Sequence, residues 1–214
     1  MLLNKILWYS IFFPFVLGSF YYPRLRFSHK MLYGFICVGV LTELSSRFLK
    51  KVFEIKNNMP LGHLYISISF IFIALFYLLE LKGFLNRKII IATIILFEFF
   101  SILNVTFFQS YYSYPSITGA TSALILVAFS IILFTKIIVE GKIKILSQSS
   151  LIWINTAVLI YYAGNFFFYV LYNFILSYSR EFTIQTLYFF AVLNFIFYAL
   201  IAFGIWKAVI YSEN

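Results

Sequence analysis

Long runs of apolar residues, separated by short polar segments, divide the chain into seven parts. The runs cover residues 6–22, 31–49, 61–81, 89–108, 116–138, 150–176 and 183–210. Each run is continuously apolar and close to the roughly 20 residues that a helix needs to cross the apolar core of a bilayer. The pattern predicts an all-α polytopic membrane protein, a seven-transmembrane-helix bundle that forms a single domain over residues 1–214.

The composition agrees with this prediction, since 63% of the 214 residues are hydrophobic and 11% are charged. A soluble domain usually carries about 25% charged residues. The net charge of +9 could indicate a nucleic-acid partner. However, the Lys and Arg residues lie at the ends of the apolar runs, where contact with lipid headgroups explains them. We therefore expect the lipid bilayer as a partner and no nucleic acid.

The distribution of Lys and Arg between the two sides predicts the orientation. If the runs alternate in direction, ten of these residues lie on one side and six on the other. This places the amino terminus outside and the carboxyl terminus in the cytoplasm, and the uncharged, tyrosine-rich segment 107–115 on the outside. Small residues up to Gly18 allow a signal peptide that would leave six helices, but the aromatic and basic residues that follow favour an uncleaved first helix.

Two glutamates lie inside apolar runs, where a charged side chain costs about 2.5–3.5 kcal/mol and usually faces the bundle interior. Glu43 has Arg47 one helical turn away, so a local ion pair is one explanation for it. Glu98 has no cation within a turn. Both are candidates for a functional site, because ionisable residues within the membrane often are.

Other polar residues recur at helical spacing and predict a polar seam through the bundle. Interhelical hydrogen bonds, worth about 0.6 kcal/mol each, are the alternative explanation for any single Asn. By depth, most of these residues lie in the middle or outer half, which predicts an outward-open cavity walled by aromatic residues and closed towards the cytoplasm. His63 could also be an interfacial residue without a role in binding. The predicted ligand-binding residues are Glu43, His63, Glu98, Asn104, Tyr162, Asn165 and Asn194.

Several kinds of chemistry lack the residues that they need. A metal hydrolase requires three clustered ligands, whereas the chain has two His residues, predicted on opposite sides, and no Asp. A retinal pigment needs a Lys in the middle of the last helix, and Lys207 lies near its end. The sequence holds no Gly-rich phosphate loop and no arrangement typical of a nucleophilic triad. We expect no metal, no cofactor and no enzymatic activity.

Three segments resemble small seven-helix integral membrane proteins of unknown function from Bacteroidota: "LTELSSR" (41–47), "NNMPLGHLY" (57–65) and "LIWINTAVLIYYAGNFFFYVL" (151–171). The most specific part is the pattern W-I-N-x-A-x-L-I-Y-x-x-G-N-x-F that begins at Trp153. The resemblance implies a multi-pass protein of the cell inner membrane and supplies no activity. More distantly, the layout is similar to the seven-helix sensor regions of bacterial histidine kinases. No kinase region is present in this chain, so signalling would need a separate cytoplasmic partner.

These observations lead to one functional hypothesis and two alternatives. The hypothesis is a non-enzymatic sensor or receptor-like protein that binds a small or amphipathic ligand in the outward cavity. The first alternative is a small-molecule or proton-coupled transporter in which Glu43 and Glu98 titrate. The second is a structural or pore-forming membrane subunit whose polar stripes serve assembly.

Overall fold

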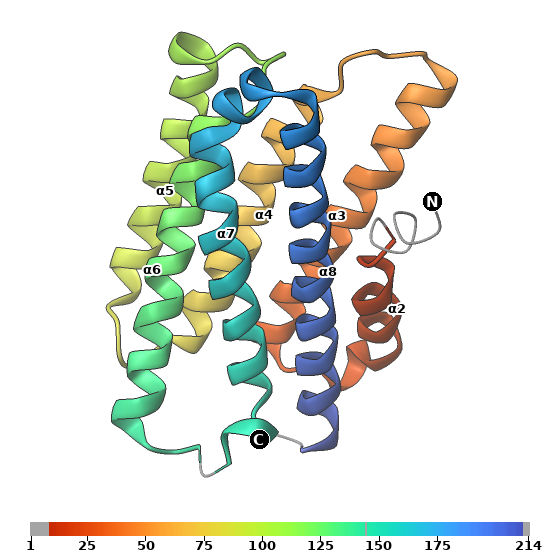
Figure 1. Ribbon diagram of the computed structural model, residues 1–214. Helices are drawn as coiled ribbons and strands as arrows, with labels where there is room; N and C mark the ends of the chain where they lie inside the picture. The colour runs from red at the N-terminus through yellow and green to blue at the C-terminus, as the bar shows by residue number, and fades with distance from the viewer. Residues whose placement is uncertain (1–8, 144, 212–214) are drawn as a thin grey trace.

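The computed structural model describes residues 9–143 and 145–211, and its regular structure is entirely helical. The helices are α2 (Phe12–Tyr21), η1 (Tyr22–Arg24), α3 (Phe27–Val52), α4 (Met59–Glu80), α5 (Arg87–Leu103), η2 (Asn104–Phe108), α6 (Ser116–Glu140), η3 (Leu146–Gln148), α7 (Ser150–Tyr178) and α8 (Arg180–Ile210). The long helices run alternately up and down and form a bundle (Figure 1). We call the end at which α3 finishes and α4 begins the upper end, and the opposite end the lower end.

Six of the described helices are long and apolar enough to cross a membrane. They correspond to the second to seventh predicted runs, so a multi-pass helical membrane bundle is confirmed at that level. The first predicted run, 6–22, lies partly outside the described residues. Its described part contains α2, whose 10 residues are shorter than a full span. A seventh transmembrane helix therefore stays a prediction.

The boundary of α3 differs from the sequence prediction, because this helix begins at Phe27, four residues before the predicted run. The added turn contains Ser28 and His29, both of which are buried. His29 Nε2 lies 3.0 Å from the Ser150 hydroxyl at the start of α7. This hydrogen bond satisfies one ring nitrogen, and the Ser28 hydroxyl lies 3.4 Å from the other, Nδ1. With both nitrogens near a partner, a polar turn can lie inside the bundle.

Local sequence signals define several helix ends. Asn86 precedes α5, and its side chain accepts a hydrogen bond from the Lys88 backbone amide. Ser179 separates α7 from α8 and accepts from the Phe182 amide in the same way. Gly141 ends α6 in a left-handed conformation, with φ 58°, that costs glycine little. These caps satisfy backbone groups that the helix itself leaves unpaired.

The helices do not pack equally on one another. α7 lies between α6 and α8 and makes the most extensive contacts in the bundle, while α3 packs chiefly on α4. The short α2 packs on α8 and α3, on the side of the bundle away from α5 and α6 (Figure 1). α5 lies at the periphery, where α4 is its main neighbour. This arrangement separates α5 from the space between α3, α7 and α8.

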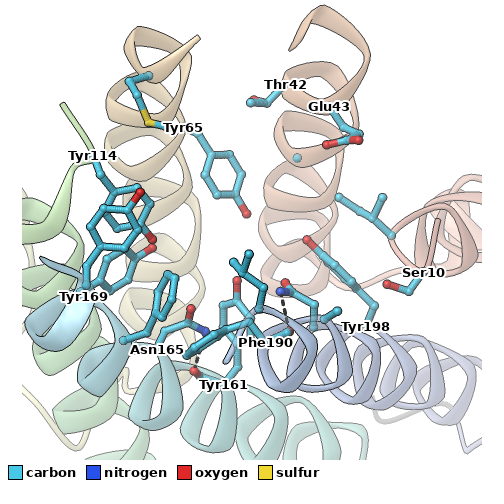
Figure 2. Close-up of a pocket in the computed structure, with 18 residues that line it drawn as sticks. Ser10, Thr42, Glu43, Tyr65, Tyr114, Tyr161, Asn165, Tyr169, Phe190 and Tyr198 are labelled. Atoms are coloured by element: carbon cyan, nitrogen blue, oxygen red, sulfur yellow. Dashed lines mark hydrogen bonds between the residues drawn. The ribbon is translucent and has the colours of Figure 1, made fainter. Parts of the chain in front are cut away.

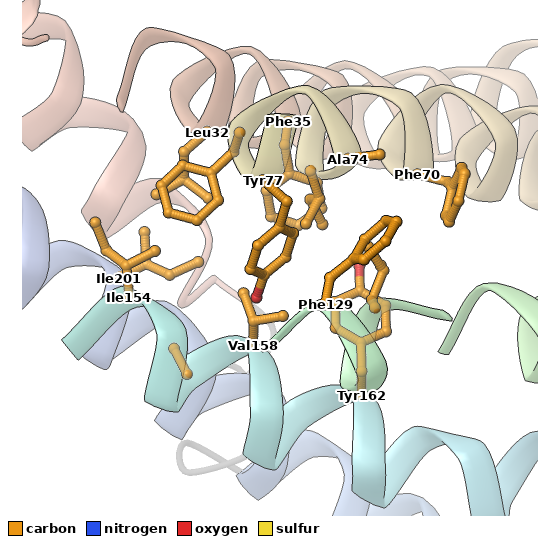
Figure 3. Packing of buried hydrophobic residues seen from close by; sticks show 14 of the residues in the cluster. Leu32, Phe35, Phe70, Ala74, Tyr77, Phe129, Ile154, Val158, Tyr162 and Ile201 are labelled. Carbon is orange, nitrogen blue, oxygen red and sulfur yellow. The ribbon is translucent and has the colours of Figure 1, made fainter. Parts of the chain in front are cut away.

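The middle and lower parts of the bundle are closed by a continuous apolar core. Its fully buried side chains come from the six long helices α3 to α8 and include Leu32, Phe35, Tyr77, Ile154 and Ile201 (Figure 3). Close packing of large side chains leaves little free volume in such a core. Among the described residues, the lower half is therefore filled by buried apolar side chains.

A network of hydrogen bonds crosses this core at Asn155, which is fully buried. The Tyr77 hydroxyl of α4 donates to Asn155 Oδ1 at 2.8 Å. The Asn155 amide donates to the Ser130 carbonyl of α6 at 2.9 Å, and the Ser130 hydroxyl donates to the Asn155 carbonyl at 3.2 Å. Asn155 thus joins α4, α6 and α7 with every side-chain polar group satisfied, the arrangement that makes a buried polar residue tolerable.

Candidate functional site: a tyrosine-lined cavity at the upper end

A cavity of about 450 Å³ opens in the upper half of the bundle, between α3, α4, α7 and α8 (Figure 2). Its size lies within the roughly 300–1,000 Å³ that is typical of small-molecule sites. Most of its lining residues are aromatic or small and polar. They are Ser10, Ile11, Gly39, Thr42, Glu43, Met59, Tyr65, Tyr114, Tyr161, Asn165, Phe168, Tyr169, Tyr172, Leu187, Phe190, Ala191, Asn194 and Tyr198.

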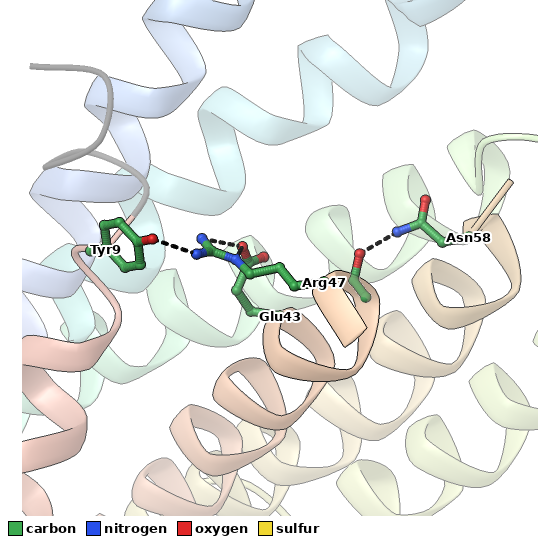
Figure 4. A network of polar contacts seen from close by, with 5 residues as sticks. Tyr9, Glu43, Arg47 and Asn58 are labelled. Atoms are coloured by element: carbon green, nitrogen blue, oxygen red, sulfur yellow. Dashed lines mark hydrogen bonds and ion pairs between the residues drawn. The ribbon is translucent and has the colours of Figure 1, made fainter. Parts of the chain in front are cut away.

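Glu43 of α3 is the charged residue of this lining. Arg47, one turn later, forms an ion pair with it, and both its Nε and its Nη2 lie 2.7 Å from Glu43 Oε1 (Figure 4). Arg47 Nη1 also donates to the Tyr9 hydroxyl at 2.7 Å, and its guanidinium lies 4.6 Å from the centre of the Tyr9 ring. The local pair considered from the sequence is therefore present, and the same carboxylate also faces the cavity.

Two asparagines contribute their amides to the floor of the cavity. Asn165 of α7 donates to the Tyr161 carbonyl at 2.8 Å, and Asn194 of α8 donates to the Phe190 carbonyl at 2.9 Å. Because a backbone carbonyl can only accept, the nitrogen of each amide must point at its own helix. Each amide oxygen is thereby turned away from the helix backbone and can accept a hydrogen bond.

Tyrosine rings form one wall of the cavity. Tyr114 stacks on Tyr172 and Tyr169, and Phe168 meets the Tyr114 ring edge to face. Burial, together with the neighbouring tyrosines, raises the pKa of the Tyr114 hydroxyl above its ordinary value. The hydroxyl is therefore neutral at physiological pH and can both donate and accept.

Gly119 of α6 makes room for this wall. A Cβ atom at Gly119 would overlap the ring of Tyr169, which lies directly against the backbone of α6. A larger residue would move the ring, because the side chain and the helix could not occupy the same volume. The glycine therefore fixes where one tyrosine of the wall lies.

The loop that carries Tyr114 is held by side chains on three successive backbone carbonyls. Asn57 donates to the Tyr112 carbonyl at 2.8 Å, His63 Nε2 to the Ser113 carbonyl at 3.0 Å, and Gln109 to the Tyr114 carbonyl at 2.6 Å. Since the Ser113 oxygen can only accept, His63 must carry its proton on Nε2. These bonds fix the backbone on both sides of the Tyr114 ring.

A second, more polar cavity of about 550 Å³ lies next to this loop at the upper end. Residues of the loops after α3 and η2 form most of its wall. It shares Met59, Tyr114 and Tyr172 with the first cavity. These three side chains therefore separate an outer polar space from the deeper tyrosine-lined one.

The structure brings together three of the seven predicted binding residues, since Glu43, Asn165 and Asn194 line the deeper cavity. Tyr162 belongs to the buried core, where its ring meets Phe197 edge to face (Figure 3). His63 and Asn104 lie outside the lining. They hold the loop instead, because His63 bonds Ser113 directly and Asn104 donates to the Gln109 side chain at 3.1 Å.

Glu98 lies apart from the cavity, on the peripheral helix α5. The Ser67 hydroxyl of α4 interacts with its carboxyl group, and Ser67 also lies 3.0 Å from the Ser101 hydroxyl. Among the described residues, Glu98 Oε1 is buried without a hydrogen-bond partner. Glu43 and Glu98 therefore do not share a site, although the sequence placed both inside the membrane.

Sequence reasoning assigned no binding role to Tyr65, Tyr114 or the other tyrosines of the lining. Their number was a signal, because the chain has 17 Tyr among 214 residues. Tyrosine is also common at membrane interfaces, so abundance alone does not distinguish a cavity wall from an interfacial belt. Helical spacing predicted one polar face of α7, and three of its five residues line the cavity. The five are Asn155, Tyr162, Asn165, Tyr169 and Tyr172, of which Asn155 and Tyr162 are buried outside the lining.

The described residues hold no group of three or more His, Cys, Asp or Glu placed to bind one metal ion. In comparisons with protein-family models, curated proteins and solved structures, no match to the chain was found. Function therefore has to be inferred from the cavity and its chemistry.

Proposed function

We propose that the chain is a non-enzymatic membrane receptor or sensor that binds a small or amphipathic ligand in the tyrosine-lined cavity. The observation that carries this proposal is the cavity itself, whose wall combines one carboxylate, two amides and several tyrosine hydroxyls with apolar side chains. A largely apolar pocket with a few converging polar groups is the usual form of a small-molecule site.

The closed lower half supports binding in preference to passage. Beneath the cavity, Phe35 and Tyr77 are fully buried, and Asn155 ties three helices together. A carrier would have to open this packed region in each cycle, whereas a receptor needs only to change shape around the ligand. In this proposal the change reaches a separate cytoplasmic partner through the loops of the lower end.

The orientation and the compartment belong to the same proposal. With the amino terminus outside, the cavity opens towards the exterior of the cell inner membrane. Support comes from basic residues at the lower end, including Arg24, Lys82, Arg87 and Lys142, because positive charge favours the cytoplasmic side. In a Cys37→Ala background, an impermeant thiol reagent added to intact cells should label Lys56→Cys and not Lys142→Cys. The reverse labelling would place the cavity on the cytoplasmic side.

Ligand binding can be tested without knowing the natural ligand. The purified protein in lipid nanodiscs should gain thermal stability with some members of a panel of small amphipathic compounds, because a ligand that binds only the folded state stabilises it. The same compounds should fail to stabilise Ala191→Phe, in which a large ring fills the cavity. Equal stabilisation of both proteins by every active compound would mean that the cavity is not the binding site.

A proton-coupled carrier is the rival function, and the observation that favours it is Glu98 Oε1, which is buried without a hydrogen-bond partner among the described residues. An ionisable group inside the membrane without a full set of hydrogen bonds is typical of proton relays. Proteoliposomes that move protons or substrate, and that lose this flux in Glu98→Gln, would establish the carrier. Binding without flux, unchanged by Glu98→Gln, is the result that we expect.

A further inference from the structure

We propose that the ligand of the cavity is an amphipathic amine, with a protonated ammonium group at Glu43 and an apolar or aromatic body against the tyrosine wall. This inference rests on the proposed function and names the chemical class that the site takes. Three features of the lining carry it: the free acceptors of the amides, the open oxygen of the carboxylate and the aromatic surface opposite.

The polar groups of the floor are available chiefly as hydrogen-bond acceptors. Asn165 and Asn194 each direct an N–H at a carbonyl of their own helix, which leaves the amide oxygen for another donor. A ligand rich in N–H donors matches these oxygens. The amide oxygens at the floor of the cavity therefore favour a ligand that donates hydrogen bonds.

Glu43 adds a preference for a positively charged ligand. Both contacts from Arg47 are to Oε1 of Glu43, and Arg47 itself is not part of the lining. Among the described residues, the second oxygen, Oε2, has no hydrogen-bond or ion-pair partner and is left for a partner on the cavity side. Among the described residues that line the cavity, Glu43 is the only charged one. A cation in the cavity therefore has a carboxylate oxygen within reach, whereas the guanidinium of Arg47, which an anion would need, lies outside the lining.

Arg47 is positioned so that it does not occupy the site of the cation. Its Nη1 donates to the Tyr9 hydroxyl at 2.7 Å, and the guanidinium lies over the Tyr9 ring. These contacts hold the guanidinium against Tyr9, in the turn that precedes α2 (Figure 4). Arg47 thus orients the carboxylate and leaves its other oxygen to the ligand.

The opposite wall suits the rest of such a ligand. In Figure 2, Tyr65, Tyr114 and Tyr169 lie across the cavity from Thr42 and Glu43. Aromatic faces attract cations and also pack well on apolar or aromatic groups. A metal ion is a poorer match, because a hard cation needs several charged or carbonyl oxygens converging on one point.

Three isosteric probes test the inference: 2-phenylethylamine, 2-phenylethanol and 3-phenylpropionate, which carry positive, neutral and negative polar ends on the same aromatic body. Binding to the protein in nanodiscs is followed by thermal stabilisation and by calorimetry. We expect the amine to bind roughly tenfold more tightly than the alcohol, a modest gain for one ion pair, and the carboxylate not to bind. Glu43→Gln should remove the preference of the amine over the alcohol.

Matched variants separate charge from folding. Glu140→Gln removes another ion-paired glutamate, bonded to Lys142 at the lower end, and should keep the amine preference. Arg47→Gln keeps the carboxylate and should bind the amine at least as tightly as the unaltered protein. If the alcohol or the carboxylate binds best, and binding is lost in Ala191→Phe, the cavity is a binding site but the amine inference is wrong. If no probe of the three binds in the cavity, both the inference and its premise are overturned for ligands of this size.

Discussion

Tyr114 stacks nearly parallel on Tyr172, with ring centroids 3.8 Å apart and planes at 15°, and both rings border the two cavities of the upper end. Removing one ring should join the outer polar cavity to the deeper one. In a Cys37→Ala background, a cysteine introduced at Ala191 reports access to the deep cavity. We expect Tyr114→Ala to increase its rate of labelling by a water-soluble thiol reagent severalfold.

Two variants make this prediction specific. Tyr114→Phe keeps the ring and should leave the labelling rate unchanged. Tyr112→Ala removes an exposed ring of the same loop and should also have little effect. If Tyr114→Ala labels no faster than these two, the ring pair does not separate the cavities, and access to Ala191 follows another route.

The loop that carries Tyr114 should depend on His63. His63→Ala removes the hydrogen bond to the Ser113 carbonyl and the stacking of the imidazole on Tyr111. We expect faster amide hydrogen exchange in residues 110–115 and a loss of about 0.5–1.5 kcal/mol in stability, the usual worth of one such bond. Thr121→Ala, which affects a hydroxyl bonded to its own helix, is the control. Unchanged exchange in His63→Ala would show that Asn57 and Gln109 suffice to hold the loop.

The residues of the hydrogen-bond network around Asn155 should be energetically coupled. Asn155→Leu removes the acceptor of the Tyr77 hydroxyl and the donor to the Ser130 carbonyl, whereas the Ser130 hydroxyl keeps the backbone carbonyl of residue 155. We expect a loss of about 1–3 kcal/mol in the free energy of unfolding. Tyr77→Phe removes one bond and should cost about 0.6–1.7 kcal/mol. The double variant should be little worse than Asn155→Leu alone, because the Tyr77 hydroxyl has already lost its partner. Strictly additive losses, measured by unfolding in mixed micelles, would mean that the two residues are not coupled.

Gly119 and Gly62 form a matched pair. At Gly119 an added methyl group would overlap the Tyr169 ring, whereas at Gly62 it would meet Pro115 Cγ at an ordinary 3.6 Å. Gly119→Ala should lower stability by about 1–3 kcal/mol through overpacking and weaken ligand binding, because the displaced ring enters the cavity. Gly62→Ala should be neutral or slightly stabilising, since alanine favours a helix. Equal thermal stability of the two variants would contradict this description of the α6–α7 contact.

The helices could be predicted from the sequence because a membrane span depends on one property, the length of a continuous apolar run. The stripe on α7 was predicted for a similar reason. Residues spaced at three and four positions share a face, so Asn155, Tyr162, Asn165, Tyr169 and Tyr172 were expected on one side of the helix. The last three line the cavity, whereas Asn155 and Tyr162 are buried below it.

The spacing of residues along one helix does not show which neighbouring helix a given face packs against. Glu98, Ser101 and Asn104 recur every three residues and so share one face of their helix. Ser101 and Asn104 are buried, but α5 packs on α4 at the edge of the bundle. Glu98 therefore lies on the other side of α4 from Glu43. The contribution of Tyr114 was equally hidden, because it depends on a loop whose path is set by His63 and Gln109.

The hydrogen bond between His29 and Ser150 attaches α3 near its lower end. It attaches the first turn of α3 to the first turn of α7, whereas Glu43 lies about four turns away along the same helix. A rod held near one end moves least at that end and most at the other. Any change in the tilt of α3 is therefore largest at the cavity and smallest at His29, so a displacement at Glu43 reaches the lower end of the bundle as a small rotation about a fixed point.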